Sequence, residues 1–322
     1  MIRRISYILF LLAAVCLLLE LAYRSQIIDF YSRELNALNP NLNSKKENVL
    51  IFGDSFSADP NSYVHQLRKN FPSYNFINCA LPGSGIKQHR LFFTARVERF
   101  QPKIILYQFY VGNDFLDIRH AINWNSLPFW RNAYWWISER LQIIQYFNFK
   151  MAFLNVPNNN SRNLKEKRFS PSLYNKRTAI YLKGNPAYLE NTIGLREEQG
   201  NNYAFWKNEM SSLLADLNED VSVFFIPIPH HAQLSRKNEQ KMRIMNAELN
   251  LPVQEVNYKL LKQIKQDLPS LKVINPLENF QLAEKRGLQL YFENDPHLTI
   301  KGQRLLAELI AERLTLSTPF YK

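Results

Sequence analysis

Five short apolar runs, separated by helix-like stretches, constrain the fold of this chain more than any other feature. Each run is rich in β-branched and aromatic residues and is bounded by Gly, Pro or polar residues, as buried strands are. The runs cover residues 48–53, 74–81, 103–112, 221–229 and 271–277. Helical patterns lie at about residues 60–71, 86–100, 202–219, 238–268 and 300–315. Strands alternating with helices predict an α/β fold, a flavodoxin-like three-layer sandwich with a mostly parallel five-stranded sheet.

One domain with an insertion accounts for most of the length. The chain has 322 residues, of which 46% are hydrophobic, so it can bury a substantial core. We assign residues 25–47 to a linker and residues 48–318 to the α/β domain. The strand pattern stops at about residues 116–215, which we interpret as a helical and loop insertion. Cys16 and Cys79 are the only cysteines, so no disulfide framework is expected.

Residues 1–24 read as a membrane anchor. Arg3 and Arg4 precede an uncharged run that continues to Glu20, and about 20 apolar residues suffice to span a bilayer. A cleaved signal sequence, which would leave a secreted protein, is the alternative. The run exceeds the roughly 7 to 15 residues of a typical signal core, and no small-x-small cleavage site follows it. The two arginines predict a cytoplasmic N-terminus, with the α/β domain on the outer, periplasmic or extracellular side.

Polar and glycine residues follow the strands at the edge of the sheet where ligands bind in parallel folds. We expect Asp59 to cap a helix that has Pro60 at its first position, so that Ser55 lies in a strand-to-helix turn. The groups are Gly53-Asp54-Ser55 after the first run, Gly83 and Gly85 after the second, Asn113 after the third, and Asp295 with His297 before the last helix. Four such groups on separate crossovers predict one constellation at the carboxyl edge of the sheet.

These four blocks resemble those of the SGNH, or GDSL-like, serine hydrolase superfamily. The resemblance covers residues 48–115 and about 220–315. It implies that Ser55 is the nucleophile, His297 the base and Asp295 the acid that orients it. It also implies an oxyanion hole formed by the backbone N–H groups of Ser55 and Gly83 and the side-chain amide of Asn113. Many members carry Asp-x-x-His, a spacing that would put Asn294 in the place of the acid.

Other residues near these blocks are candidate substrate contacts. His230 and His231 follow the fourth run, where they contact substrate or lie in a solvated loop; a metal site would need a third ligand that the spacing does not supply. No Gly-rich phosphate loop is present, and we expect no metal, nucleotide or other cofactor. The candidate contacts are Asp54, Gly85, Asp114, Trp124 and His230.

The insertion has an unusual composition. Residues 124–136 hold four of the five tryptophans, and residues 150–183 hold eight Lys or Arg against one acidic residue. We interpret the tryptophans as packing of a helical cap, with a sugar-stacking platform or a patch beside the bilayer as alternatives. The basic residues favour a solvated loop, which would also attract an anionic lipid surface or an acidic polymer.

The net charge of +12 does not point to nucleic acid, because the expected topology places the domain outside the cytoplasm. The sequence therefore predicts a membrane-anchored serine esterase or deacylase that acts on an ester-bearing carbohydrate or lipid of the cell envelope. An O-acyltransferase with the same site, and a non-catalytic ligand-binding module on the same fold, are the alternatives. The oligomeric state is left open.

Overall fold

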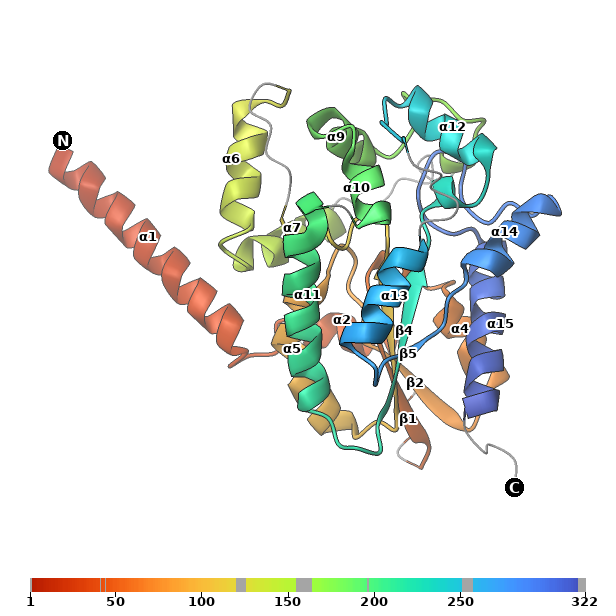
Figure 1. Cartoon of the computed structure of the whole chain (residues 1–322). Helices are drawn as coiled ribbons and strands as arrows, with labels where there is room; N and C mark the ends of the chain where they lie inside the picture. The colour runs from red at the N-terminus through yellow and green to blue at the C-terminus, as the bar shows by residue number, and fades with distance from the viewer. Residues whose placement is uncertain are drawn as a thin grey trace.

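A parallel five-stranded sheet forms the centre of the protein (Figure 1). The computed structural model describes residues 2–40, 42–43, 45–119, 126–154, 164–195, 197–250 and 257–317. The strand order is β2-β1-β3-β4-β5, and every paired strand runs parallel to its neighbour. The strands are β1 (Glu47–Phe52), β2 (Tyr74–Asn78), β3 (Ile104–Tyr110), β4 (Ser222–Ile228) and β5 (Lys272–Val273). The predicted flavodoxin-like sandwich is confirmed, and each strand falls within a residue of a predicted run or inside it.

Helices cover both faces of the sheet and extend beyond one end of it. They are α1 (Ile2–Ser25), α2 (Ser32–Leu38), α3 (Ser55–Ala58), α4 (Tyr63–Asn70), α5 (Ile86–Phe100), α6 (Phe129–Ser138), α7 (Ile143–Leu154), α9 (Lys176–Gly184), α10 (Tyr188–Gly194), α11 (Glu197–Ala215), α12 (Arg236–Ile244), α13 (Asn257–Asp267), α14 (Leu277–Lys285) and α15 (Ile300–Ser317).

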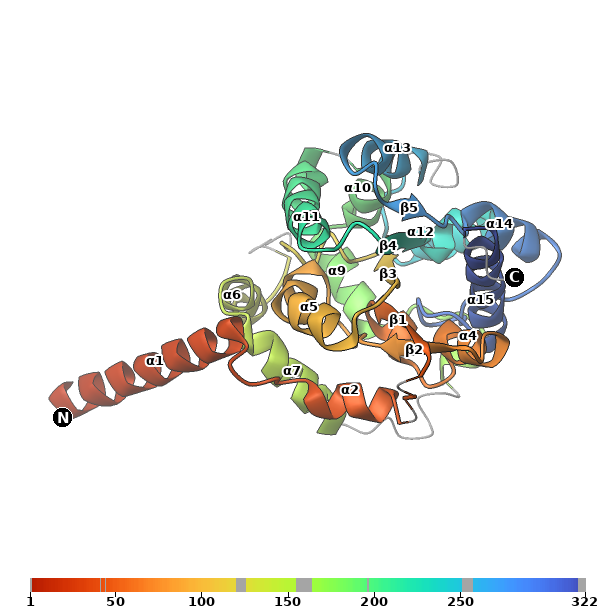
Figure 2. The same ribbon diagram turned by 90° about the horizontal axis from the view of Figure 1, so that it is seen from below.

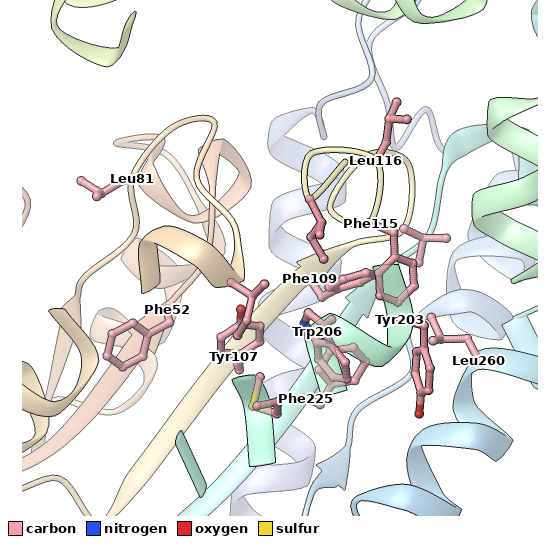
Figure 3. Packing of buried hydrophobic residues seen from close by; sticks show 14 of the residues in the cluster. Phe52, Leu81, Tyr107, Phe109, Phe115, Leu116, Tyr203, Trp206, Phe225 and Leu260 are labelled. Atoms are coloured by element: carbon pink, nitrogen blue, oxygen red, sulfur yellow. The ribbon is translucent and has the colours of Figure 1, made fainter. Parts of the chain in front are cut away.

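Helices α5, α11 and α13 pack on one face of the sheet through an aromatic core. Trp206 of α11 is fully buried, with its ring centroid 5.8 Å from that of Phe109 and 5.3 Å from that of Phe225 (Figure 3). Because side chains alternate along a strand, these two phenylalanines lie on the same face of the sheet. A buried Trp or Phe stabilises such a core by roughly 3 to 5 kcal/mol relative to alanine.

Helices α4, α14 and α15 pack on the opposite face against the alternate strand residues. The backbone N–H of Tyr63 at the start of α4 donates to the side-chain oxygen of Gln303 in α15, at 2.9 Å. Gly302 passes very close to the preceding loop, since a Cβ there would lie 2.4 Å from the carbonyl oxygen of Leu290. Only glycine fits this approach, which fixes how α15 sits beneath the loop that carries His297.

Two predicted elements differ from the structure. The helix predicted over residues 238–268 is two helices, because Asn246 adopts a left-handed conformation (φ 69°) and ends α12. The segment expected to be a linker contains α2, which buries Leu35 in the core formed with α5.

The insertion between β3 and β4 places α6, α7, α9 and α10 beyond the carboxyl ends of the strands, and α11 then returns the chain to β4 (Figure 1). Its tryptophans divide into two kinds. Trp135 is 5% exposed and packs inside the insertion, whereas Trp130 is 79% exposed. Trp124 lies outside the described residues.

The apolar helix α1 projects from the body of the protein (Figures 1 and 2). Among the described residues it is the helix long and apolar enough to cross a membrane, and most of it is exposed. The C-terminal end of α1 is hydrogen-bonded to the insertion. The Glu20 carboxylate accepts from the backbone N–H groups of Gln142 (3.0 Å) and Ile143 (2.9 Å) at the start of α7. Tyr23 is fully buried against Tyr146 of α7.

Candidate active site

Ser55 stands at the first position of a one-turn helix directly after β1. The Asp54 carboxylate caps this turn by accepting from the backbone N–H of Phe56 at 2.9 Å. The expected cap at Asp59 is wrong: α4 begins only at Tyr63, and Asp59 instead ends α3 and accepts from Asn61. Because Asp54 already supplies a cap, the helical turn starts at Ser55 itself, which lifts its hydroxyl out of the sheet.

The Ser55 hydroxyl contacts His297, which in turn contacts Asp295. Ser55 Oγ lies 2.7 Å from His297 Nε2, and His297 Nδ1 hydrogen-bonds Oδ1 of Asp295. The same carboxylate oxygen accepts from the backbone N–H of His297 at 3.0 Å. Since a carboxylate at Nδ1 requires a proton on that nitrogen, Nε2 of the neutral ring is free to accept from Ser55.

Asp295, and not Asn294, is the residue that contacts the imidazole. Asn294 points into the insertion, where its amide donates to the carbonyl of Lys167 (2.8 Å) and accepts from the backbone N–H of Ser170 (2.9 Å). The second oxygen of Asp295 lies 3.3 Å from Nζ of Lys165 and 3.2 Å from Nδ2 of Asn175.

The surroundings keep Asp295 ionised. Burial by itself raises the pKa of Asp295, but the hydrogen bonds from His297 and the positive charge of Lys165 help to outweigh it and hold the pKa below its usual range. An ionised carboxylate at this position orients the imidazole and stabilises its protonated form.

Gly83 and Asn113 line the same cavity as Ser55. Gly83 has a φ of 72°, a left-handed conformation that glycine adopts without steric cost, and it follows β2. Asn113 follows β3, and its side-chain amide donates to Oδ2 of Asp117 one turn later. An amide NH₂ carries two protons, so one remains for a group in the cavity.

A cluster from the insertion holds Asp117 in place. Nη2 of Arg177 lies 2.6 Å from each carboxylate oxygen of Asp117, and the Tyr181 hydroxyl donates to Oδ1 at 2.7 Å. Nε of Arg177 also donates to the Tyr181 hydroxyl at 2.6 Å. Helix α9 thereby neutralises the carboxylate of Asp117. Without this neutralisation, the charge of Asp117 would repel any negative charge that comes near Asn113. The resemblance did not cover this part of the chain, although the i, i+4 spacing of Asn113 and Asp117 is a signal in the sequence.

The cavity at Ser55 is small, about 60 Å³, and its wall includes two polar atoms without a hydrogen-bond partner among the described residues. These are Nε2 of His230 and the hydroxyl of Tyr110, both on buried side chains. Nδ1 of His230 accepts from the backbone N–H of Ala232, so Nε2 carries the proton of the neutral ring. Burial lowers the pKa of His230 to about 3 and keeps it neutral. The solvated loop expected for His230 and His231 is therefore wrong, and His231 is buried against Tyr174, whose hydroxyl lies 2.7 Å from its Nε2.

The remaining candidates take different places. Asp54 lines the cavity, and its pKa is raised by burial although the N–H of Phe56 opposes that effect. Gly85 and Asp114 do not line it: Gly85 caps α5, and Asp114 is buried with a carboxylate oxygen 2.9 Å from the N–H of Tyr110. Burial and the charge of Asp54 raise the pKa of Asp114 well above its usual range. Asp114 is thus part of the support beneath the turn after β3.

Comparison with solved structures finds several that are similar to this chain. An acetyl xylan esterase shares 12% identity, covering 83% of this chain and 99% of that one, with a TM-score of 0.45. A member of the lipolytic G-D-S-L family from Veillonella parvula shares 12% identity over 84% and 98% of the chains, with a TM-score of 0.41. A lipase/acylhydrolase from Enterococcus faecalis shares 12% identity over 86% and 100%, with a TM-score of 0.43. No protein-family model and no curated protein matches the sequence.

Proposed function

We propose that the protein is a serine esterase or deacylase, anchored in a membrane, that cleaves a carbohydrate or lipid ester outside the cytoplasm through an acyl-serine intermediate. The observation that carries the proposal is the continuous chain of contacts from Ser55 through His297 to Asp295. Three buried or half-buried polar groups in this order suit nucleophilic catalysis, whereas a ligand-binding module needs no base behind the hydroxyl.

The reaction follows from the direction of these hydrogen bonds. His297 Nε2 takes the proton of the Ser55 hydroxyl while Oγ attacks the ester carbonyl, and Asp295 stabilises the imidazolium that forms. The tetrahedral intermediate collapses when the alcohol leaves with the proton from His297, and Ser55 keeps the acyl group. A water molecule then gives its proton to His297 and attacks the acyl-serine, which releases the acid and restores Ser55.

Negative charge on the carbonyl oxygen needs donors in the intermediate. The free amide proton of Asn113 and the backbone N–H groups of Ser55 and Gly83 are the proposed donors, since these residues surround one side of the cavity. The donors belong to three turns that follow three adjacent strands, so the sheet itself fixes their relative positions.

The membrane part of the proposal rests on how α1 meets the insertion. Glu20 and Tyr23 are buried in the body of the protein, so removal of α1 as a signal sequence would strip contacts from α7. Near the C-terminal end of α6, Nη2 of Arg24 donates to the carbonyl oxygen of Arg140 at 3.0 Å. Helix α6 exposes Phe129 (60%) and Trp130 (79%), residues suited to the boundary between bilayer and water. These contacts favour an uncleaved anchor. A chain with a C-terminal tag that runs at full length and stays in the membrane fraction after an alkaline wash supports this; a shortened, soluble product contradicts it.

The catalytic proposal is tested with the full chain in detergent. Wild type should hydrolyse p-nitrophenyl acetate and react with a fluorophosphonate probe, and both activities should vanish in Ser55→Ala. Ser212→Ala, a change at an exposed serine of α11, is the matched control and should keep both. Labelling that survives in Ser55→Ala would remove Ser55 from the role of nucleophile. Transfer of the acyl group to an added alcohol in preference to water would instead assign the acyltransferase alternative.

A further inference from the structure

A second and larger cavity adjoins the catalytic one within the insertion. It has a volume of about 380 Å³ and is enclosed mainly by α6, α7 and α9. Gly83, Arg177 and Tyr181 line both cavities, so the two share a wall that includes Gly83, one of the proposed oxyanion donors. A substrate whose ester carbonyl lies at Ser55 would reach this space by extending past Gly83.

The lining of the second cavity combines aromatic rings with planar polar groups. Tyr134 and Phe149 contribute half-buried rings, and Arg131, Gln145 and Asn148 contribute a guanidinium and two amides. Rings that face the C–H side of a sugar, with amides that donate to and accept from hydroxyl groups, match the alternating surface of a saccharide. A volume of this size is in the range of small-molecule sites, roughly 300 to 1,000 Å³.

The charge of the cavity favours an anionic ligand. Arg131 is exposed and forms no ion pair with the described residues, and its guanidinium lies 5.9 Å from the ring centroid of Tyr134. Asp117 is the carboxylate in the lining, and Arg177 already neutralises it through two hydrogen bonds. A carboxylate or phosphate on the ligand would find in Arg131 a donor that is not already engaged.

A long acyl chain fits this lining poorly. It would desolvate the guanidinium of Arg131 and the amide of Gln145 without offering either group a hydrogen bond in return. The alcohol part of the ester, not its acyl part, is thus the better occupant.

We propose that this second cavity is a binding site for the sugar moiety of the substrate, a saccharide that carries an anionic substituent and presents its ester to Ser55. The inference rests on the proposed esterase function and names its substrate class. The insertion then supplies specificity, while the turns of the sheet supply the reacting groups.

Binding is measured first, because it does not depend on turnover. Full-length Ser55→Ala protein in detergent is titrated calorimetrically with O-acetylated oligogalacturonate and with neutral O-acetylated xylo-oligosaccharide. We expect the uronate to bind at least 10-fold more tightly, and the additional change Arg131→Gln to weaken its binding about 10-fold, as loss of a charge-assisted hydrogen bond does. Arg236→Gln, at an exposed arginine of α12 away from the cavity, is the matched control and should leave the binding unchanged.

Hydrolysis by the wild-type protein, measured as acetate release from the same saccharides, separates this inference from the esterase proposal. The ratio of kcat/KM for the uronate to that for p-nitrophenyl acetate should fall in Arg131→Gln and in Gln145→Ala. Equal binding of both saccharides, no binding, or unchanged affinity in Arg131→Gln overturns the sugar site even where p-nitrophenyl acetate is hydrolysed. A preference for p-nitrophenyl octanoate over p-nitrophenyl acetate that Arg131→Gln and Gln145→Ala increase would assign the cavity to an acyl chain and also overturn the sugar site. Binding without any hydrolysis would keep the site and refute the esterase.

Discussion

Asp117 is expected to act on catalysis only through Asn113, and this can be measured. Its carboxylate accepts from the Asn113 amide and is held by Arg177 and Tyr181. Replacing Asp117 with alanine frees the Asn113 side chain to rotate away from the cavity. The change leaves Arg177 bound to the Tyr181 hydroxyl, with its side chain 48% exposed and hence solvated.

The size of the effect has two bounds. An oxyanion donor contributes about 2.7 to 4 kcal/mol, so Asn113→Ala should lower kcat by about 100- to 1,000-fold. A hydrogen bond to a charged group contributes about 1.5 to 3 kcal/mol, so loss of the orientation that Asp117 provides should lower kcat by about 10- to 150-fold. The second change cannot exceed the first if Asp117 works through Asn113 alone.

A double-mutant cycle on p-nitrophenyl acetate hydrolysis decides the matter. In the Asn113→Ala background, Asp117→Ala should change kcat by less than about 2-fold, because the donor that it orients is already gone. Asp216→Ala, at a half-exposed carboxylate that pairs with Arg90, is the control for removal of an acidic side chain. If Asp117→Ala lowers kcat by the same factor in both backgrounds, Asp117 acts independently of Asn113 and the reasoning is refuted.

Two further predictions concern stability. Burial lowers the pKa of His89 to about 4, that of His230 to about 3 and that of His231 well below its usual value, so the unfolded chain binds more protons below its own histidine pKa of about 6.5. The free energy of unfolding, measured in urea, should therefore be steady above pH 7 and fall as the pH drops from 6.5 towards 4, by up to about 1.4 kcal/mol per pH unit for each histidine. The variant His89→Gln should make this dependence on pH shallower. An unchanged slope in His89→Gln contradicts the assignment of His89. Gly302→Ala should destabilise the protein by at least about 1 to 3 kcal/mol, because its Cβ would lie 2.4 Å from the Leu290 carbonyl oxygen. Gly200→Ala, where a Cβ meets open space, is the control. Equal melting temperatures of the two variants would count against the clash.

The sequence predicted those parts of the molecule that general rules of parallel sheets determine. Ser55 and Asn113 could be placed together because the carboxyl ends of parallel strands meet at one edge, whatever their separation in the chain, whereas His297 was added by the resemblance. The helix predicted over residues 238–268 failed because the left-handed Asn246 was read as part of a periodic pattern, although Asn and the later Pro252 both disfavour a continuous helix.

The contacts from the insertion could not be predicted in the same way. Arg177 and Lys165 reach the site from segments whose position depends on tertiary packing and not on periodicity. The choice between Asp295 and Asn294 also needed the structure, since two adjacent polar residues differ only in which way the turn directs them. Asn294 faces the insertion because backbone groups there satisfy its amide, and this leaves Asp295 to face the histidine.

The polar contacts between the insertion and the loop before α15 limit which parts of this protein can be removed or replaced. Asn294 is bonded to backbone groups of residues 167 and 170, and Asp295 to the side chains of Lys165 and Asn175. A chain from which the insertion had been excised could keep the sheet and its two helical layers, yet it would lose the partners that hold the acid in place. The insertion, which we propose selects the ligand, therefore cannot be exchanged as a separate unit. Any different cap placed on this sandwich has to bring its own support for Asp295.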